Sequence, residues 1–337
     1  MSQTVSGTMT DTAPERAPAL EVRDLRIRID AEAGSFTVVD DMSLAVRPGE
    51  TLCIVGESGC GKSMTALSLL RLLPEGAHVE RGSIRVGETD LLALSERRAE
   101  DIRGDRIAMI FQEPLTALNP VMTVGAQIAE AVCRHRSLSR KAGWAAAVQA
   151  LRGVQMPDAE QRAQQYPHEL SGGMRQRAMI ALALCCDPAV IVADEPTTAL
   201  DVTVQAQILG LMANLQREHG TAVVLITHDL AVVAEIADRV IVMYAGRRVE
   251  EAAITDLFDA PLHPYTRGLM GAIPHVGGVG RLMDIPGTVP PLWNLPEGCA
   301  FAPRCPLATA QCSAETPPLR AHRPGHLAAC WNVTHDA

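Results

Sequence analysis

The eight residues Gly-Glu-Ser-Gly-Cys-Gly-Lys-Ser at positions 56–63 constrain the fold of this chain more than any other segment. An apolar run at 51–55 leads into them, and a segment with helical spacing follows at 63–73. A glycine loop between a strand and a helix is the P-loop arrangement, in which backbone N–H groups and the helix N-terminus favour phosphate. We therefore expect a nucleotide site, with Lys62 on the β- and γ-phosphates and Ser63 on Mg²⁺.

The composition excludes several classes of protein. Thirty Lys and Arg against 39 Asp and Glu give a net charge of −9, which argues against a dedicated nucleic-acid binder. No run of 18 or more apolar residues is present, so we expect no membrane span. Residues 1–20 are polar, with no apolar region of the secretory type, and we expect them to be disordered and the protein to lie in the cytoplasm.

The remaining pattern predicts an α/β fold. Short segments near residues 25–29 and 42–46 alternate between apolar and polar side chains, as half-buried strands do. Buried apolar runs at 189–193, 222–226 and 240–244 are separated by helical segments, which indicates a mostly parallel sheet. The Ala-rich stretch 114–170 has helical spacing and no buried-strand run, so we expect an inserted helical subdomain there.

Two carboxylates follow the apolar run that ends at Ala193. Asp194 is suited to the Mg²⁺ shell, and Glu195 to positioning or deprotonating the attacking water. In-line phosphoryl transfer requires both roles near the γ-phosphate.

The segment Leu-Ser-Gly-Gly-Met-Arg-Gln-Arg at 170–177 resembles the signature sequence of ABC-type ATPases. The resemblance extends over residues 21–255. It implies a P-loop NTPase (RecA-like) core with an antiparallel β subdomain, the inserted helical subdomain at about 114–170, and a loop-rich C-terminal extension at 256–337.

The resemblance also implies roles for single residues. Glu195 would be the catalytic base, His228 the switch histidine and Gln112 the Q-loop residue that senses Mg²⁺ or water and couples to a transmembrane partner; Asp201 would belong to the D-loop. The Mg²⁺ residues would be Ser63, Gln112 and Asp194. The ATP-binding residues would be Phe36 at the adenine, with Gly56, Glu57, Ser58, Gly59, Cys60, Gly61, Lys62, Ser63 and Met64. The thiol of Cys60 would make the site sensitive to thiol reagents.

The signature implies a partner. Ser171, Gly172, Gly173 and Gln176 would contact the ATP of a second ABC ATPase subunit, identical or similar to this one, so that two ATP molecules are sandwiched head-to-tail. The other implied partners are two transmembrane permease subunits and an extracytoplasmic substrate-binding protein, with no nucleic acid. The chain would then lie on the cytoplasmic face of the membrane as a peripheral subunit.

The C-terminal segments at 262–274, 284–292 and 298–312 resemble the C-terminal region of oligopeptide/dipeptide importer ATPases, a group that nickel importers share. The resemblance implies peptide import, with nickel or another small solute as the alternative cargo. Cys299, Cys305, Cys312 and Cys330 lie in this region without a Cys-x-x-Cys pair. Four thiolates in a reducing compartment favour a [4Fe–4S] cluster, while zinc or reduced structural thiols stay open. A soluble ABC ATPase acting on DNA or ribosomes, and a generic P-loop kinase, fit the motifs and composition less well.

Overall fold

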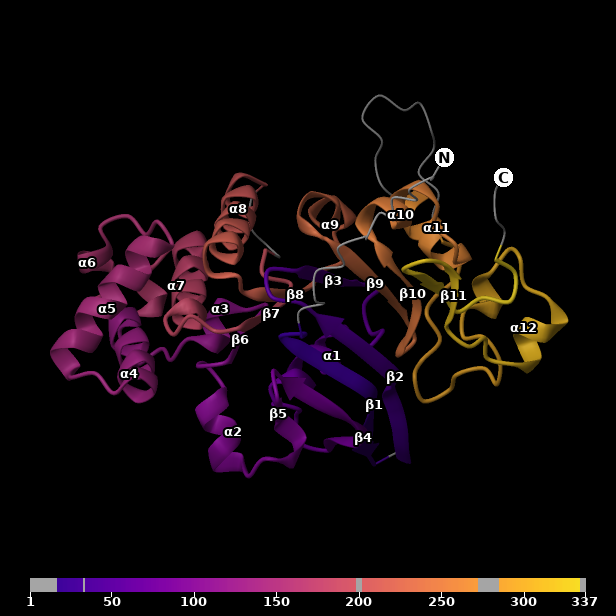
Figure 1. Ribbon diagram of the computed structural model, residues 1–337, viewed down its shortest axis with the longest axis horizontal. Coiled ribbons are helices and arrows are strands. Elements are labelled where there is room, and N and C mark those ends of the chain that lie inside the picture. The colour runs from indigo at the N-terminus through magenta and orange to yellow at the C-terminus, as the bar shows by residue number, and fades with distance from the viewer. Residues whose placement is uncertain (1–16, 33, 198–201, 272–284, 334–337) are drawn as a thin grey trace, which may run out of the picture.

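The computed structural model describes residues 17–32, 34–197, 202–271 and 285–333, in two sheets with helices around them (Figure 1). The predicted disorder at 1–20 falls mostly outside these residues, and so does Asp201. The larger sheet has eight strands in the order β11-β12-β10-β9-β3-β8-β7-β6, and the smaller has four in the order β2-β1-β4-β5. None of the helices in the described residues is long and apolar enough to cross a membrane.

Five parallel strands form the centre of the larger sheet: β9 (Arg239–Tyr244), β3 (Thr51–Val55), β8 (Ala222–Ile226), β7 (Val190–Asp194) and β6 (Ile107–Ile110). Every residue of β3, β6, β7 and β8 is buried, as expected for parallel strands covered on both faces. The predicted parallel sheet is therefore confirmed, and the carboxyl ends of these strands meet at one edge.

The smaller sheet is antiparallel throughout and consists of β1 (Leu20–Ala31), β2 (Gly34–Val46), β4 (Ala77–Val86) and β5 (Thr89–Asp90). Leu25 and Ile27 of β1 are fully buried, while the arginines between and beside them are not. The buried face packs into one apolar cluster with the larger sheet and with helix α1 (Lys62–Leu69). This contact sets the antiparallel strands beside the P-loop.

Helices occupy the chain between β6 and β7. They are α3 (Pro114–Ala117), α4 (Val124–Arg136), α5 (Arg140–Gly153), α6 (Ala159–Arg162) and α7 (Gly172–Leu184), and α4–α7 gather at one end of the molecule (Figure 1). Thr123 and Ser139 cap α4 and α5 with their hydroxyl groups. No strand lies among the described residues between β6 and β7, in agreement with the helical spacing of the sequence.

The other helices lie before and after this helical segment in the chain. They are α2 (Glu96–Ile102), α8 (Val202–His219), α9 (Leu230–Ile236), α10 (Ile254–Asp259), α11 (Pro264–Gly271) and α12 (Ala310–Ala314), with 3₁₀ turns at Leu91–Ala93, Pro167–Glu169 and Ala302–Arg304.

The C-terminal region is not the separate extension that its Pro- and Gly-rich sequence indicated. Its strands β11 (Arg320–Arg323) and β12 (His326–Ala328) continue the larger sheet through β10 (Arg247–Ala253). The fully buried carboxylate of Glu250 in β10 accepts hydrogen bonds from the backbone N–H groups of Leu262 and His263 and bonds the His326 ring at 2.7 Å. Short strands and one buried ionic centre thus join this region to the core.

Candidate functional site

The P-loop is shaped by glycines that no other residue could replace without a clash. Gly56 (φ +155°) and Gly61 (φ +98°) have positive φ angles that L residues rarely adopt. A Cβ atom on Gly56 would lie 2.3 Å from the carbonyl oxygen of Met243, and one on Gly61 would lie 2.6 Å from that of Val38. The loop therefore lies directly against β9 and β2.

Lys62 places a buried cation inside this loop. Its side chain is 6% exposed, and its Nζ donates to the carbonyl oxygens of Gly56 at 2.8 Å and Glu57 at 3.0 Å. An ammonium held at the start of a helix, beside free backbone N–H groups, gives an anion charge-assisted hydrogen bonds in a poorly hydrated place.

Ser63 and Asp194 lie together behind the lysine. The Ser63 hydroxyl donates to Oδ1 of Asp194 at 3.2 Å. Burial raises the pKa of the Asp194 carboxyl, and the hydrogen bond from Ser63 opposes that shift. A hydroxyl and a carboxylate are oxygen ligands of the kind that Mg²⁺ takes, so these residues fit the predicted role.

Glu195 contacts two polar side chains that follow other strands of the larger sheet. Gln112 follows β6, Glu195 follows β7 and His228 follows β8. Gln112 Nε2 donates to Oε2 of Glu195 at 3.3 Å, and His228 Nδ1 lies 3.1 Å from its Oε1. Glu195 also has a left-handed backbone, φ +45°, which is uncommon for a residue other than glycine and typical of functional sites.

One cavity unites these groups. It is lined by Gln112, Glu195 and His228 and by all of the predicted ATP-binding residues except Gly56 and Cys60. Asp194 lies beneath it, bonded to Ser63. Residues from separate parts of the sequence therefore meet around the P-loop, and their roles toward ATP stay predictions.

The signature residues do not line that cavity in the described structure. Ser171 caps α7, its hydroxyl accepting from the Met174 N–H at 3.4 Å, and Ser171 and Gly172 are exposed. Gln176 is different, because it is 2% exposed and its side chain donates to the carbonyl oxygen of Pro196. In the described subunit Gln176 links α7 to the segment after Glu195, and its predicted contact with a partner's nucleotide stays a prediction.

Phe36, the predicted adenine-binding residue, has neighbours in the cavity that the sequence did not reveal. Phe36 and Val38 of β2 line the cavity together with Leu292 of the C-terminal region. Two more C-terminal residues contact the P-loop: the Tyr265 hydroxyl accepts from the Glu57 N–H at 2.9 Å, and Arg304 pairs with the Glu57 carboxylate at 3.0 and 3.1 Å. More than 200 residues separate the partners in each contact, so no local pattern could have indicated them.

Comparison with known proteins agrees with this geometry. The family described as ABC transporter matches residues 39–198, and the oligopeptide/dipeptide transporter C-terminal region matches 249–312. A probable peptide ABC transporter ATP-binding protein of Sinorhizobium fredii is 54% identical over 94% of this chain and 96% of its own. The chain belongs to the ATP-binding subunits of the oligopeptide/dipeptide ABC transporter family. An oligopeptide transport ATP-binding protein of Salmonella typhimurium is 48% identical over 98% of this chain and 99% of its own.

Solved structures of ABC cassettes share the fold. A dimeric ATP-binding cassette in a post-hydrolysis state with ADP and phosphate aligns with a TM-score of 0.64 at 26% identity. It covers 70% of this chain and 98% of its own length. The predicted P-loop NTPase fold of an ABC ATPase is confirmed.

The match to the family's C-terminal region contains Cys299, Cys305 and Cys312, and Cys330 follows it; the four thiols line one cavity together with Phe301 and Trp331. Backbone N–H groups of Phe301 and Ala302 hydrogen-bond the Cys299 thiol, and the Asn332 N–H donates to Cys330 at 3.3 Å. No group of three or more His, Cys, Asp or Glu side chains among the described residues could hold a metal ion. The predicted iron–sulfur cluster is therefore without support from a metal-binding group and stays a prediction.

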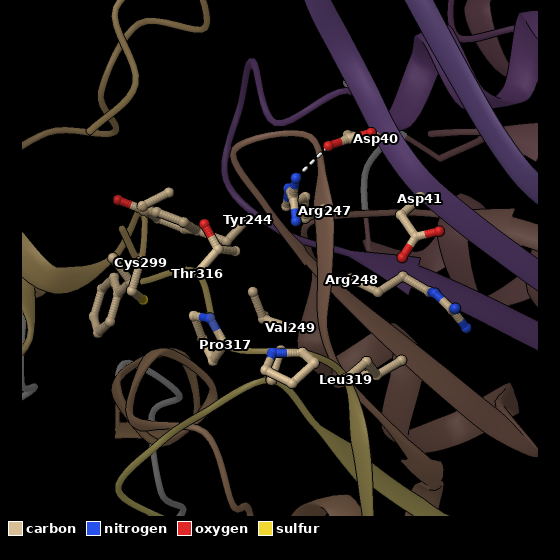
Figure 2. Close-up of a pocket in the computed structure, with 14 residues that line it drawn as sticks. Asp40, Asp41, Tyr244, Arg247, Arg248, Val249, Cys299, Thr316, Pro317 and Leu319 are labelled. Carbon is tan, nitrogen blue, oxygen red and sulfur yellow. Dashed lines mark hydrogen bonds and ion pairs between the residues drawn. The ribbon is translucent and has the colours of Figure 1, made fainter. Parts of the chain in front are cut away.

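Another pocket lies apart from the P-loop, between β10 and the C-terminal segment near Pro317 (Figure 2). Arg247 pairs with Asp40 at its rim, and Val249, Pro317 and Leu319 give it an apolar wall. It shares Cys299 and Phe301 with the cysteine-lined cavity. None of the predicted ATP-binding residues lines it.

Proposed function

We propose that this chain is the ATP-hydrolysing subunit that powers the import of di- and oligopeptides across the cytoplasmic membrane. The observation that carries the proposal is the Glu195 carboxylate, which Gln112 and His228 hold from both sides in the cavity of the P-loop. Relatives about 50% identical over nearly the whole chain bear the names of peptide import or oligopeptide transport ATP-binding proteins.

Each residue has a chemical part in this proposal. Lys62 and the loop N–H groups bind the phosphates. Ser63 and Asp194 would hold Mg²⁺, which would neutralise charge on the phosphates. Glu195 accepts the proton of the attacking water, and the hydrogen bond from Gln112 fixes the direction of its carboxylate. His228, with a side chain that is 62% exposed, contacts the γ-phosphate.

The second half of each ATP site comes from a partner ATPase, a second copy or a similar chain. Ser171 and Gly172 expose the N-terminus of α7, which is a ready anion site, and they do not line the cavity of their own P-loop. Closing two subunits head-to-tail brings each α7 onto the other's γ-phosphate, so ATP shifts the population towards the closed dimer.

The transmembrane partners are two permease subunits, and an extracytoplasmic binding protein delivers the peptide. A groove between the α4–α7 helices and the core is lined by Met122, Met179 and Phe111, the residue before Gln112. The exposed apolar side chains of Leu115 (51%) and Val121 (79%) flank this region in sequence. A permease helix docked here holds the chain on the cytoplasmic face of the membrane and receives the closing motion.

Cys299, Cys305, Cys312 and Cys330 are the residues that would hold a [4Fe–4S] cluster. They line one cavity, and backbone N–H groups bond the Cys299 and Cys330 sulfur atoms, as occurs around protein clusters. Iron and acid-labile sulfide measured on anaerobically purified protein test this, with a Cys312→Ser variant for comparison. Absence of iron and sulfide from the wild-type protein would remove the cluster from the proposal.

The test of the ATPase mechanism is Glu195→Gln, with Glu235→Gln on the exposed face of α9 as the matched control. We expect Glu195→Gln to bind ATP, to accumulate as a closed dimer and to lose turnover by about 10²- to 10⁴-fold, the usual contribution of a general base. Near-normal hydrolysis would refute the base assignment.

The test of transport is ATP hydrolysis in proteoliposomes with the permeases and binding protein. Stimulation by peptide supports import, whereas stimulation only by nucleic acid or by nickel would overturn it.

A further inference from the structure

The C-terminal region presents a tryptophan at the mouth of the nucleotide cavity. Pro291–Asn294 form a tight turn, closed by a 2.8 Å hydrogen bond from the Asn294 N–H to the Pro291 carbonyl. Leu292 of this turn lines the cavity, and the Trp293 ring lies 6.0 Å from the Phe36 ring at an interplanar angle of 71°. Trp293 is 73% exposed, the second largest exposed fraction after Val121 among the exposed large apolar residues described.

Contacts on both sides hold this turn near the P-loop. Leu292 packs against the apolar clusters on both faces of the larger sheet. Before the turn, the carbonyl oxygens of Ile285 and Pro286 accept from Arg304 at 3.2 and 2.9 Å, and the same guanidinium pairs with Glu57. The segment that carries Trp293 is therefore joined to the loop that binds phosphate.

The chemistry of this corner favours an aromatic base. A purine exposes a flat π-face, and apolar and aromatic side chains stack on it whatever its hydrogen-bonding edge. Trp293 buries little of its surface in the structure, so packing against Phe36 alone does not explain a tryptophan here. The phosphates are fixed by Lys62 in the same cavity, which directs the other end of a nucleotide to Phe36 and Leu292.

We propose that Trp293 stacks on the adenine base of ATP beside Phe36, the two rings meeting edge to face, with Leu292 as the apolar floor of the base site. This inference rests on the proposed ATPase function and adds a base-binding residue from the C-terminal region. The nucleotide site is then built by both matched parts of the chain, and the C-terminal region contributes to ATP affinity.

The test compares ligands with and without a base. Binding of ATP and of inorganic tripolyphosphate is measured by calorimetry for Trp293→Ala, Trp293→Phe and Phe36→Ala. Trp144→Ala is the control, because Trp144 lies on α5 and is 36% exposed. Stacking on one aromatic residue is worth about 1–3 kcal/mol, so Trp293→Ala should weaken ATP binding by about 5- to 150-fold and leave tripolyphosphate unchanged. The phenylalanine variant should recover part of the loss.

Other outcomes separate this inference from the proposed function. Unchanged ATP affinity in Trp293→Ala, or an equal loss for tripolyphosphate, would overturn the base-site assignment while leaving the ATPase intact. Unchanged ATP binding in Lys62→Ala would instead contradict the ATPase site itself. A Trp144→Phe/Trp331→Phe protein keeps Trp293 as its one tryptophan. Its emission should change with ATP and stay constant with tripolyphosphate; a constant signal with ATP contradicts the contact.

Discussion

The ion pair between Arg304 and Glu57 gives a sharp test of how the C-terminal region holds the P-loop. The Arg304 side chain is 5% exposed, and its guanidinium bonds both carboxylate oxygens of Glu57 and the carbonyl oxygens of Ile285 and Pro286. Arg304→Met removes these four hydrogen bonds, and a longer one to the Tyr244 hydroxyl at 3.4 Å, while keeping the apolar stem. Glu57→Gln removes the charge of the partner and keeps one acceptor.

The magnitude follows from burial. Hydrogen bonds that involve a charged group contribute about 1.5–3 kcal/mol when buried. Glu57 is 30% exposed, so water replaces part of what it loses, and we assign about 2 kcal/mol to its pair with Arg304. The two carbonyl partners add about 1 kcal/mol each. Arg304→Met should therefore lower the free energy of unfolding by about 4 kcal/mol, and Glu57→Gln by about 1–2 kcal/mol.

The assay is a double-mutant cycle in urea, followed by tryptophan fluorescence. If the pair is the main interaction, the double variant should lose about 1–2 kcal/mol less than the sum of the single losses. Arg323→Met is the control, because Arg323 is exposed on β11, and its effect should stay within about 0.5 kcal/mol. Additivity of the two changes to within about 0.5 kcal/mol would refute the reasoning, since independent sites behave in that way.

Three further predictions use other parts of the structure. Burial lowers the pKa of His263 from an ordinary 6.5 to about 4, so the unfolded chain takes up a proton at a higher pH than the folded chain. The free energy of unfolding should therefore fall by up to about 3 kcal/mol between pH 6.5 and 4. Urea midpoints measured against pH test this, and a flat profile would contradict it. Burial raises the pKa of Glu250, but its hydrogen bonds lower it by more, so the folded chain keeps this carboxylate ionised to a lower pH. The free energy of unfolding should therefore fall further below pH 4.5. Gln176→Leu removes the bond to Pro196 and should reduce turnover about 10-fold with ATP affinity unchanged; normal steady-state kinetics would argue against that link. Cys60 is fully buried and burial raises its thiol pKa, so native protein should resist maleimide labelling at this site, and rapid labelling shown by mass spectrometry would count against the structure.

The expected resistance of Cys60 to labelling replaces the expectation, drawn from the sequence, that its thiol makes the site sensitive to thiol reagents. A thiol in a glycine loop suggests an accessible group, because neighbouring loop residues are exposed to ligand. The structure places Cys60 under the loop, where its sulfur lies 3.8 Å from Lys62 Nζ and would lie 2.8 Å from a Cβ on Gly56. The exposure of a residue within a tight loop depends on its direction, which a motif does not specify.

The parts of the site that were predictable are local to strand ends. Gln112, Glu195 and His228 each follow a buried apolar run, and parallel strands bring their carboxyl ends to one edge of a sheet. Once the runs are recognised as parallel strands, their closing residues are expected to meet, and the hydrogen bonds of Glu195 to the other two agree with this. Short motifs at the ends of the apolar runs were therefore enough to predict that these three residues lie together.

Gln176 is buried on α7, and its predicted contact with a partner's nucleotide stays a prediction. It shares its face of α7 with Met179, Ile180 and Ala183, three and four residues and two turns further on, and all of them are buried. The helical period alone places Gln176 inward. The signature resemblance does not by itself give the direction of the side chain at position 176, which the helical period of α7 does.

The C-terminal region could not be placed from sequence because its stability depends on distant partners. The buried Glu250 of β10 receives its hydrogen bonds from Leu262, His263 and His326, which lie 12, 13 and 76 positions later in the chain. A carboxylate at 0% exposure is tolerated only with such partners, so removing the chain after residue 255 would leave a buried, unpaired charge in a strand of the main sheet.

The P-loop likewise depends on contacts with distant residues of the C-terminal region. The backbone N–H of Glu57 is bonded by Tyr265 and its carboxylate by Arg304, so the phosphate loop obtains part of its shape from residues more than 200 positions later. If ATP tightens that loop, the contacts of Tyr265 and Arg304 tighten with it, and by linkage whatever stabilises those contacts must favour ATP binding to the same degree. The boundary at residue 255 therefore divides the sequence pattern but does not divide the nucleotide site.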